Sequence, residues 1–60
     1  MKTYRIYTRD RGKKYSALRE IKAISENEAL RRAALPPDWH AVAIEWPPSA
    51  ISEKWLKKNV

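Results

Sequence analysis

The 60-residue sequence contains no cysteine, no phenylalanine, one glycine and one histidine. Without cysteine the chain has no disulfide, no thiolate nucleophile and no Cys-based zinc site, so we expect a cytoplasmic location. A single glycine excludes a glycine-rich loop that cradles phosphates. No apolar run approaches the roughly 20 residues that span a bilayer, and the start of the chain lacks the apolar stretch of a secretory signal. We therefore expect no membrane association.

The sequence also has few residues that are suited to catalysis. His40 is the only histidine. It could serve as a general acid or base in RNA cleavage if Lys or Arg stabilised the developing charge, and the acidic residues available as partners are Asp38 and Glu45. One histidine with scattered carboxylates provides too few ligands for a metal ion. A chain of this length has no room for a separate cofactor domain. We predict no enzymatic activity, no metal and no small-molecule cofactor, and a small ribonuclease centred on His40 is the alternative.

Positive charge is abundant and unevenly placed. The formal net charge is +6 and the isoelectric point is near 10.0. Residues 1–22 carry all of this excess, because the basic and acidic residues of 23–60 balance. A concentrated positive field attracts phosphates or an acidic protein surface. Solubility is the other explanation, since a net charge of about 2–8 keeps a small domain in solution.

The first third of the chain predicts a β-hairpin over residues 3–24. Residues 3–9 alternate in character and are rich in β-branched and aromatic types, as strands are. Gly12 supplies the positive φ that a short turn needs. The alternation turns Tyr4 and Ile6 toward the protein interior.

The register of this hairpin decides which side chains face outward, and two registers fit. A four-residue loop, 10–13, places Arg19 on the inner face, where its stem would line the core and its head would reach water. A three-residue loop pairs Tyr7 with Tyr15 and requires a β-bulge near Arg19. Both registers leave the same three side chains of the first strand on the outer face: Arg5, Tyr7 and Arg9.

A helix over residues 26–35 follows the hairpin. Ser25 to Glu28 match the capping box, in which the serine oxygen accepts from the third helical N–H and the glutamate reaches back. Pro36 and Pro37 end this helix, because proline disfavours helical geometry at the residue before it. Its apolar stripe consists of small and aliphatic side chains: Ala29, Leu30, Ala33 and Ala34.

The remaining residues predict a strand and a short closing helix. The strand covers 39–46 and ends at Pro47-Pro48, and the C-terminal helix covers 49–58 with Ser49 or Ser52 as its cap. The order ββαβα within a single small domain, residues 1–60, gives an α+β fold. A right-handed crossover through helix 26–35 makes the second and third strands parallel. We therefore expect a three-stranded mixed sheet in the order 2-1-3, with helix 26–35 on one face.

The outer face of the hairpin is the predicted binding surface. Arginine contacts phosphate bidentately and tyrosine offers a stacking plane, a combination found on exposed sheets that bind single-stranded nucleic acid. We therefore predict a small basic binding module that contacts nucleic acid. The alternative is a protein-interaction or inhibitor protein that docks an acidic partner surface. The candidate contact residues are Arg5, Tyr7, Arg9, Arg11, Lys13 and Lys14.

The closing helix decides whether that face is open. Helix 49–58 would cover it if Trp55 and Ile51 packed against Trp39 and Ala41. Tryptophan suits both cores and interfaces, and Trp46 and Trp55 are the candidate anchors for a partner protein or a second copy of the chain. A homodimer would also bury area that a domain of this size lacks. In size and composition the chain resembles the accessory or inhibitor proteins that bacteria and phages encode.

Overall fold

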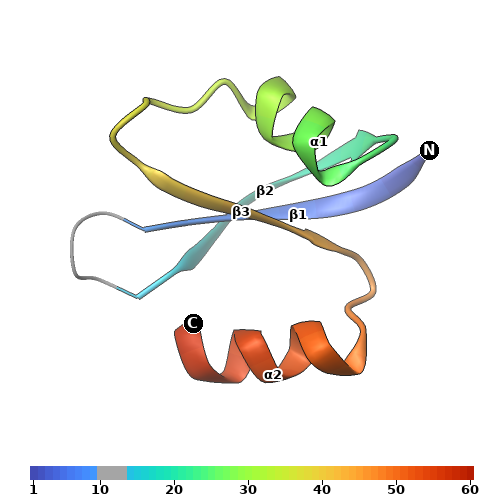
Figure 1. Ribbon diagram of the computed structural model, residues 1–60, viewed down its shortest axis with the longest axis vertical. Helices are drawn as coiled ribbons and strands as arrows, with labels where there is room; N and C mark the ends of the chain where they lie inside the picture. Colours follow the sequence, from blue (N-terminus) through green and yellow to red (C-terminus); the bar gives the residue numbers. More distant parts are fainter. Residues whose placement is uncertain (10–13) are drawn as a thin grey trace.

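A computed structural model describes residues 1–9 and 14–60 (Figure 1). The elements follow the order ββαβα, which confirms the predicted sequence of hairpin, helix, strand and closing helix. Gly12 and the rest of the predicted turn lie outside the described residues. The elements are β1 (Lys2–Arg9), β2 (Ser16–Ala23), α1 (Glu26–Ala33), β3 (His40–Glu45) and α2 (Ala50–Asn59).

The three strands form one sheet in the order β2-β1-β3, as predicted. The expectation of a mixed sheet is wrong, because β1 pairs antiparallel with both of its neighbours. The crossover through α1 does leave β2 and β3 running in the same direction. Since β1 lies between them, no parallel ladder forms.

The β1–β2 register matches neither of the two predicted registers. Ile6 pairs with Arg19, the next residue Tyr7 pairs with Ala17, and the ladder shifts between them. Leu18 is therefore the extra residue of a β-bulge, which adds one residue to β2 and bends it. The bulge does lie beside Arg19, where the three-residue loop required one.

Ser25 caps the N-terminus of α1, and Glu28 reaches back toward it, as the sequence predicted. The Ser25 hydroxyl oxygen accepts from the Glu28 backbone N–H at 3.2 Å. The Glu28 carboxylate in turn accepts from the Ile24 backbone N–H at 3.2 Å and pairs with Arg32 at 3.3 Å. The first bond satisfies a donor that the first turn of a helix leaves without a partner, whereas the second goes to the residue before the N-cap, one position earlier than in a standard capping box.

The helix ends at Ala33, two residues earlier than predicted. Ala34 leaves the helix in the left-handed region, with φ 51° and ψ 50°, because the segment must turn before Pro36. The guanidinium of Arg19 donates to the Ala33 carbonyl at 2.6 Å and so caps this end. A cation here also opposes the negative end of the helix dipole.

The conformation of Ala34 leads to a prediction about stability. The Cβ atom makes the left-handed region costly for alanine, whereas glycine adopts it freely. We expect Ala34→Gly to raise the free energy of unfolding by about 1 kcal/mol in urea titrations followed by circular dichroism. Ala17→Gly, in the exposed part of β2, is the control and should lower it by roughly 0.5–1 kcal/mol. A loss of stability in Ala34→Gly would contradict the prediction.

The core lies between the sheet and α1 and is thin. Ile6 is the largest fully buried side chain, and Tyr4 also faces α1, as the alternation predicted. Small alanines let the helix approach the sheet closely, and they contribute little buried area. The core side chains are Tyr4, Ile6, Ala23, Ala29, Ala33 and Ala43, with Ile21, Leu30 and Leu35 packed around them.

The second helix lies on the opposite face of the sheet from α1 (Figure 1). Ser49 caps it by accepting from the Ser52 backbone N–H at 3.2 Å. Its bounds are one residue later than the predicted 49–58 at each end. No residue of α2 is buried, so this helix rests on the sheet through a few large side chains rather than through a second core.

Candidate functional site

Arg5, the first residue of the predicted surface, is held by the protein itself. Its guanidinium lies 3.2 Å from the Glu20 carboxylate and 3.7 Å from the ring centroid of Trp46. Partial burial lowers the pKa of Arg5, while hydrogen bonds with Tyr7 and Glu20 and the charge of Glu20 raise it, and the net shift is upward. Arg5 is therefore a charged structural link between strands, with its hydrogen-bonding capacity already partly used.

Tyr7, the predicted stacking residue, is buried. Only 5% of the residue is exposed, because α2 covers the face to which it points. Its ring meets Trp55 edge-on, with centroids 6.3 Å apart and an interplanar angle of 71°. The predicted cover of Trp55 and Ile51 against Trp39 and Ala41 differs in detail, because Ile51 is 82% exposed. A nucleic-acid base has no access to the Tyr7 ring in this arrangement.

Tyr15 joins the base of the hairpin to the C-terminal end of α2. Its backbone N–H donates to the Asn59 carbonyl at 2.9 Å. Its ring lies 4.9 Å from that of Trp55, and the Asn59 side chain donates to the Trp55 carbonyl at 2.9 Å. Two segments that are more than 40 residues apart in the sequence are thus fixed side by side.

The three segments that meet at or next to this junction carry cations. The Arg9 guanidinium lies 5.2 Å from the Tyr15 ring centroid. Lys14 precedes Tyr15 in the chain and is exposed, and two exposed lysines occupy the last turn of α2 beside Asn59. We call this group the basic end, and it consists of Arg9, Lys14, Lys57 and Lys58.

Among the residues that the structure describes, no carboxylate forms an ion pair with a residue of the basic end. The ion pairs found there are Lys2–Glu45, Arg5–Glu20 and Arg32–Glu28, and none includes a residue of the basic end. The Arg9 Nε atom is buried without a hydrogen-bond acceptor. A buried donor without a partner is costly, but this atom has almost no solvent-accessible surface, so it offers no contact to a ligand.

The predicted and observed sets of cations overlap only in part. Arg9 and Lys14 belong to both, whereas Arg11 and Lys13 lie outside the described residues. Sequence reasoning missed Lys57 and Lys58 as contact residues. The sequence did contain a signal for them. Both lysines follow Trp55 within one turn of α2, so the packing of Trp55 on the rest of the protein also fixes where these lysines lie.

The two candidate tryptophan anchors have different environments. Trp55 is half-buried against Tyr7 and Tyr15, so it serves the fold. Trp46 is also half-buried, but it lines an apolar groove with a volume of about 540 Å³. The groove lies between the segment that follows β3 and one side of α2, and it is lined by Trp46, Pro47, Pro48, Glu53, Leu56 and Lys57.

His40 is exposed at the start of β3, where it lies opposite Arg9 in the β1–β3 ladder. Glu45 is the last residue of the same strand, about 16 Å away at roughly 3.3 Å per residue, and it is paired with Lys2. The odd spacing also puts the two side chains on opposite faces of the sheet. Of the two carboxylates considered as partners for His40, only Asp38 is close in the chain.

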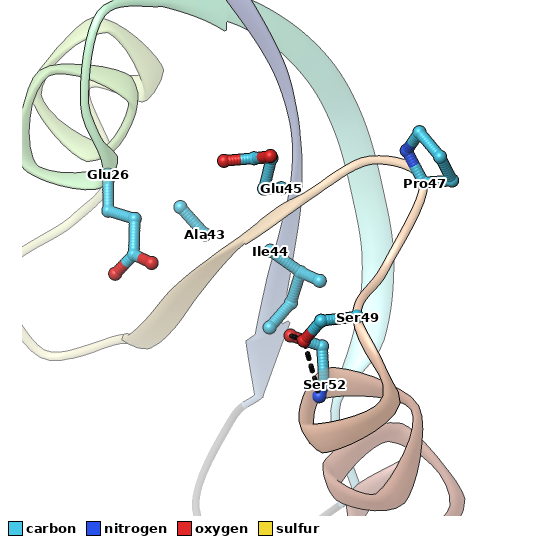
Figure 2. A pocket seen from close by; sticks show the side chains of 7 residues that line it. All are labelled: Glu26, Ala43, Ile44, Glu45, Pro47, Ser49 and Ser52. Carbon is cyan, nitrogen blue, oxygen red and sulfur yellow. Dashed lines mark hydrogen bonds between the residues drawn. The ribbon is translucent and has the colours of Figure 1, made fainter.

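A smaller cavity of about 290 Å³ lies at the edge of β3 (Figure 2). Glu26 and Glu45 line it on the α1 side, and Ser49 and Ser52 line it on the α2 side. Ser49 is occupied as the cap of α2, with its hydroxyl also 3.2 Å from the Ser52 hydroxyl. The two carboxylates make this cavity unsuitable for a phosphate.

Residues 1–9 and 14–60 contain no group of three or more His, Cys, Asp or Glu side chains arranged to hold a metal ion. Neither α1 nor α2 has the length and apolarity required to cross a bilayer. No family model matches the chain, and comparisons with curated proteins and with solved structures find no significant similarity. The basic end is therefore interpreted from its own geometry.

Proposed function

We propose that the protein is a non-enzymatic binding module that holds the phosphates of a nucleic acid at the basic end. The observation that carries this proposal is the junction at Tyr15, where the backbone bond to Asn59 and the contact with Trp55 bring together segments of the chain that carry cations. Like charges in proximity repel one another and are unfavourable unless an anion neutralises them. A polyanion provides that neutralisation at several positions at once.

Two features support phosphate rather than an isolated carboxylate as the ligand. Arg9 carries a guanidinium, and the planar fork of this group matches the bidentate geometry of phosphate. Lysines at the end of α2 reach outward on flexible stems, which suits contact with successive phosphates along a strand. Cations of this kind contact the phosphates of a nucleic-acid backbone and do not read the edges of its bases. We therefore propose that the basic end binds without strong sequence preference.

The proposal predicts steep salt dependence. The affinity for a short fluorescent oligonucleotide, measured by anisotropy between about 50 and 200 mM NaCl, should fall with a log–log slope of about −3. This value follows from four cations at roughly 0.7–0.9 per phosphate contact. A flat dependence, or no binding at about 50 mM salt, would contradict the proposal.

A second candidate is a protein partner, and the groove beside Trp46 favours it. The partner would present an apolar side chain next to a carboxylate. The apolar side chain would enter the groove, and the carboxylate would pair with Lys57. This corresponds to the alternative of an interaction or inhibitor protein that docks an acidic surface. The same anisotropy measurement separates the two candidates: binding of labelled polyglutamate without binding of the oligonucleotide would favour the protein partner.

A further inference from the structure

Trp39 is the most exposed of the aromatic residues. The chain has six aromatic residues. Tyr4 and Tyr7 are buried. Arg9 and Trp55 lie against the Tyr15 ring, and Arg5 covers the ring of Trp46. Trp39 is 40% exposed and takes part in none of the ring contacts found among the described residues.

Trp39 lies at the same end of the sheet as the cations. It directly precedes His40, and His40 is the Cα partner of Arg9 in the β1–β3 ladder. The Trp39 backbone N–H donates to the Pro36 carbonyl at 3.1 Å, which closes a turn that contains two prolines with restricted φ. The indole is therefore presented from a constrained backbone, so little ordering is needed when a ligand binds.

We infer that Trp39 stacks on a base of single-stranded nucleic acid whose phosphates are held by the basic end. This inference rests on the proposed function and adds the class of substrate. Proteins that bind single strands combine cations along the backbone with aromatic rings on which bases stack. In a duplex the bases are stacked on one another and have no face to offer, so the indole contributes to binding of single strands alone. The exposed indole takes the stacking role that the sequence assigned to Tyr7.

The experiment measures the anisotropy of one labelled oligonucleotide, alone and annealed to its complement, with the wild type and three variants. We expect the wild type to bind the single strand more tightly than the duplex. Trp39→Ala should lose about five- to hundredfold in affinity for the single strand, with an unaltered salt slope because no phosphate contact is removed. Trp39→Phe should lose less, because phenylalanine keeps a stacking plane. Ile51→Ala, also at an exposed apolar residue, should bind like the wild type.

The outcomes separate the inference from the proposed function. Single-strand affinity in Trp39→Ala within twofold of the wild type, with steep salt dependence, would overturn the stacking role and leave the phosphate site in place. An equal loss for single strand and duplex would also overturn it. Loss in Trp39→Phe as large as in Trp39→Ala, with both variants folded by circular dichroism, would exclude stacking as the cause. Binding to polyglutamate alone would overturn both.

Discussion

Replacement of Ile6 by alanine is expected to lower the free energy of unfolding by about 2–5 kcal/mol. Ile6 is the one large side chain that is fully buried among the described residues, with 0% of the residue exposed. Its neighbours in the core are mostly alanines, which are too small to fill the cavity left behind. A single core in a chain of this length rarely contributes more than about 3–5 kcal/mol. The variant should therefore be largely unfolded at 25 °C.

Ile51→Ala is the matched control, because it removes the same atoms from a residue that is 82% exposed. Its free energy of unfolding should stay within about 0.5 kcal/mol of the wild type. Urea denaturation followed by circular dichroism and by tryptophan fluorescence gives both values and tests whether unfolding is two-state. Similar losses in the two variants would show that the core does not lie between the sheet and α1.

The elements that local chemistry determines could be predicted from the sequence. The capping box at Ser25 and the proline pair at 36–37 act on their immediate neighbours, so the start of α1 was predicted correctly and its end within two residues. Ser49 was one of two proposed caps for the closing helix, and the structure selects it. The strand order 2-1-3 followed from the crossover and was correct, whereas the description of the sheet as mixed was not.

The environment of Arg5 could not be predicted, because its cross-strand partner is two residues away from the one that a loop over 10–13 gives. The register next to the turn accounts for one residue and the bulge at Leu18 for the other. A loop over 10–13 without a bulge places Arg5 opposite Leu18, whereas the observed register places it opposite Glu20. Bulges follow from the packing of the whole sheet and have no reliable local signal. The register therefore changes an outward-facing arginine into one that is paired within the protein.

The sequence left open whether the closing helix covers the outer face of the hairpin. In the structure α2 covers that face through Trp55, as one alternative had it, but the ring contacts are with Tyr7 and Tyr15, which no local pattern specifies. These contacts remove Tyr7 from the candidate surface and bring Lys57 and Lys58 into it. A binding surface of basic and aromatic residues thus remains a proposal, but it consists of a different set of residues from the one predicted.

The largest expected effect on binding comes from removing charge at the basic end. Lys14→Gln, Lys57→Gln and Lys58→Gln together should reduce the log–log salt slope by about 2–3 units. At roughly 0.1 M salt the loss in affinity for a single-stranded oligonucleotide should be about a hundredfold, since each contact contributes roughly 0.7 to the logarithm of the binding constant. Arg9 is left in place, because its contact with Tyr15 also belongs to the fold.

A second triple variant separates local contacts from overall charge. Lys22→Gln, Arg31→Gln and Lys54→Gln neutralise three exposed cations outside the basic end, so both variants lower the formal net charge from +6 by three. If the nucleic acid contacts the basic end, the control should lose no more than a few-fold in affinity, with its salt slope nearly unchanged, because long-range attraction between exposed charges is screened beyond about 10 Å at 0.1 M salt. Equal losses in the two variants would mean that the protein attracts polyanions through its net charge alone and that the junction at Tyr15 builds no site.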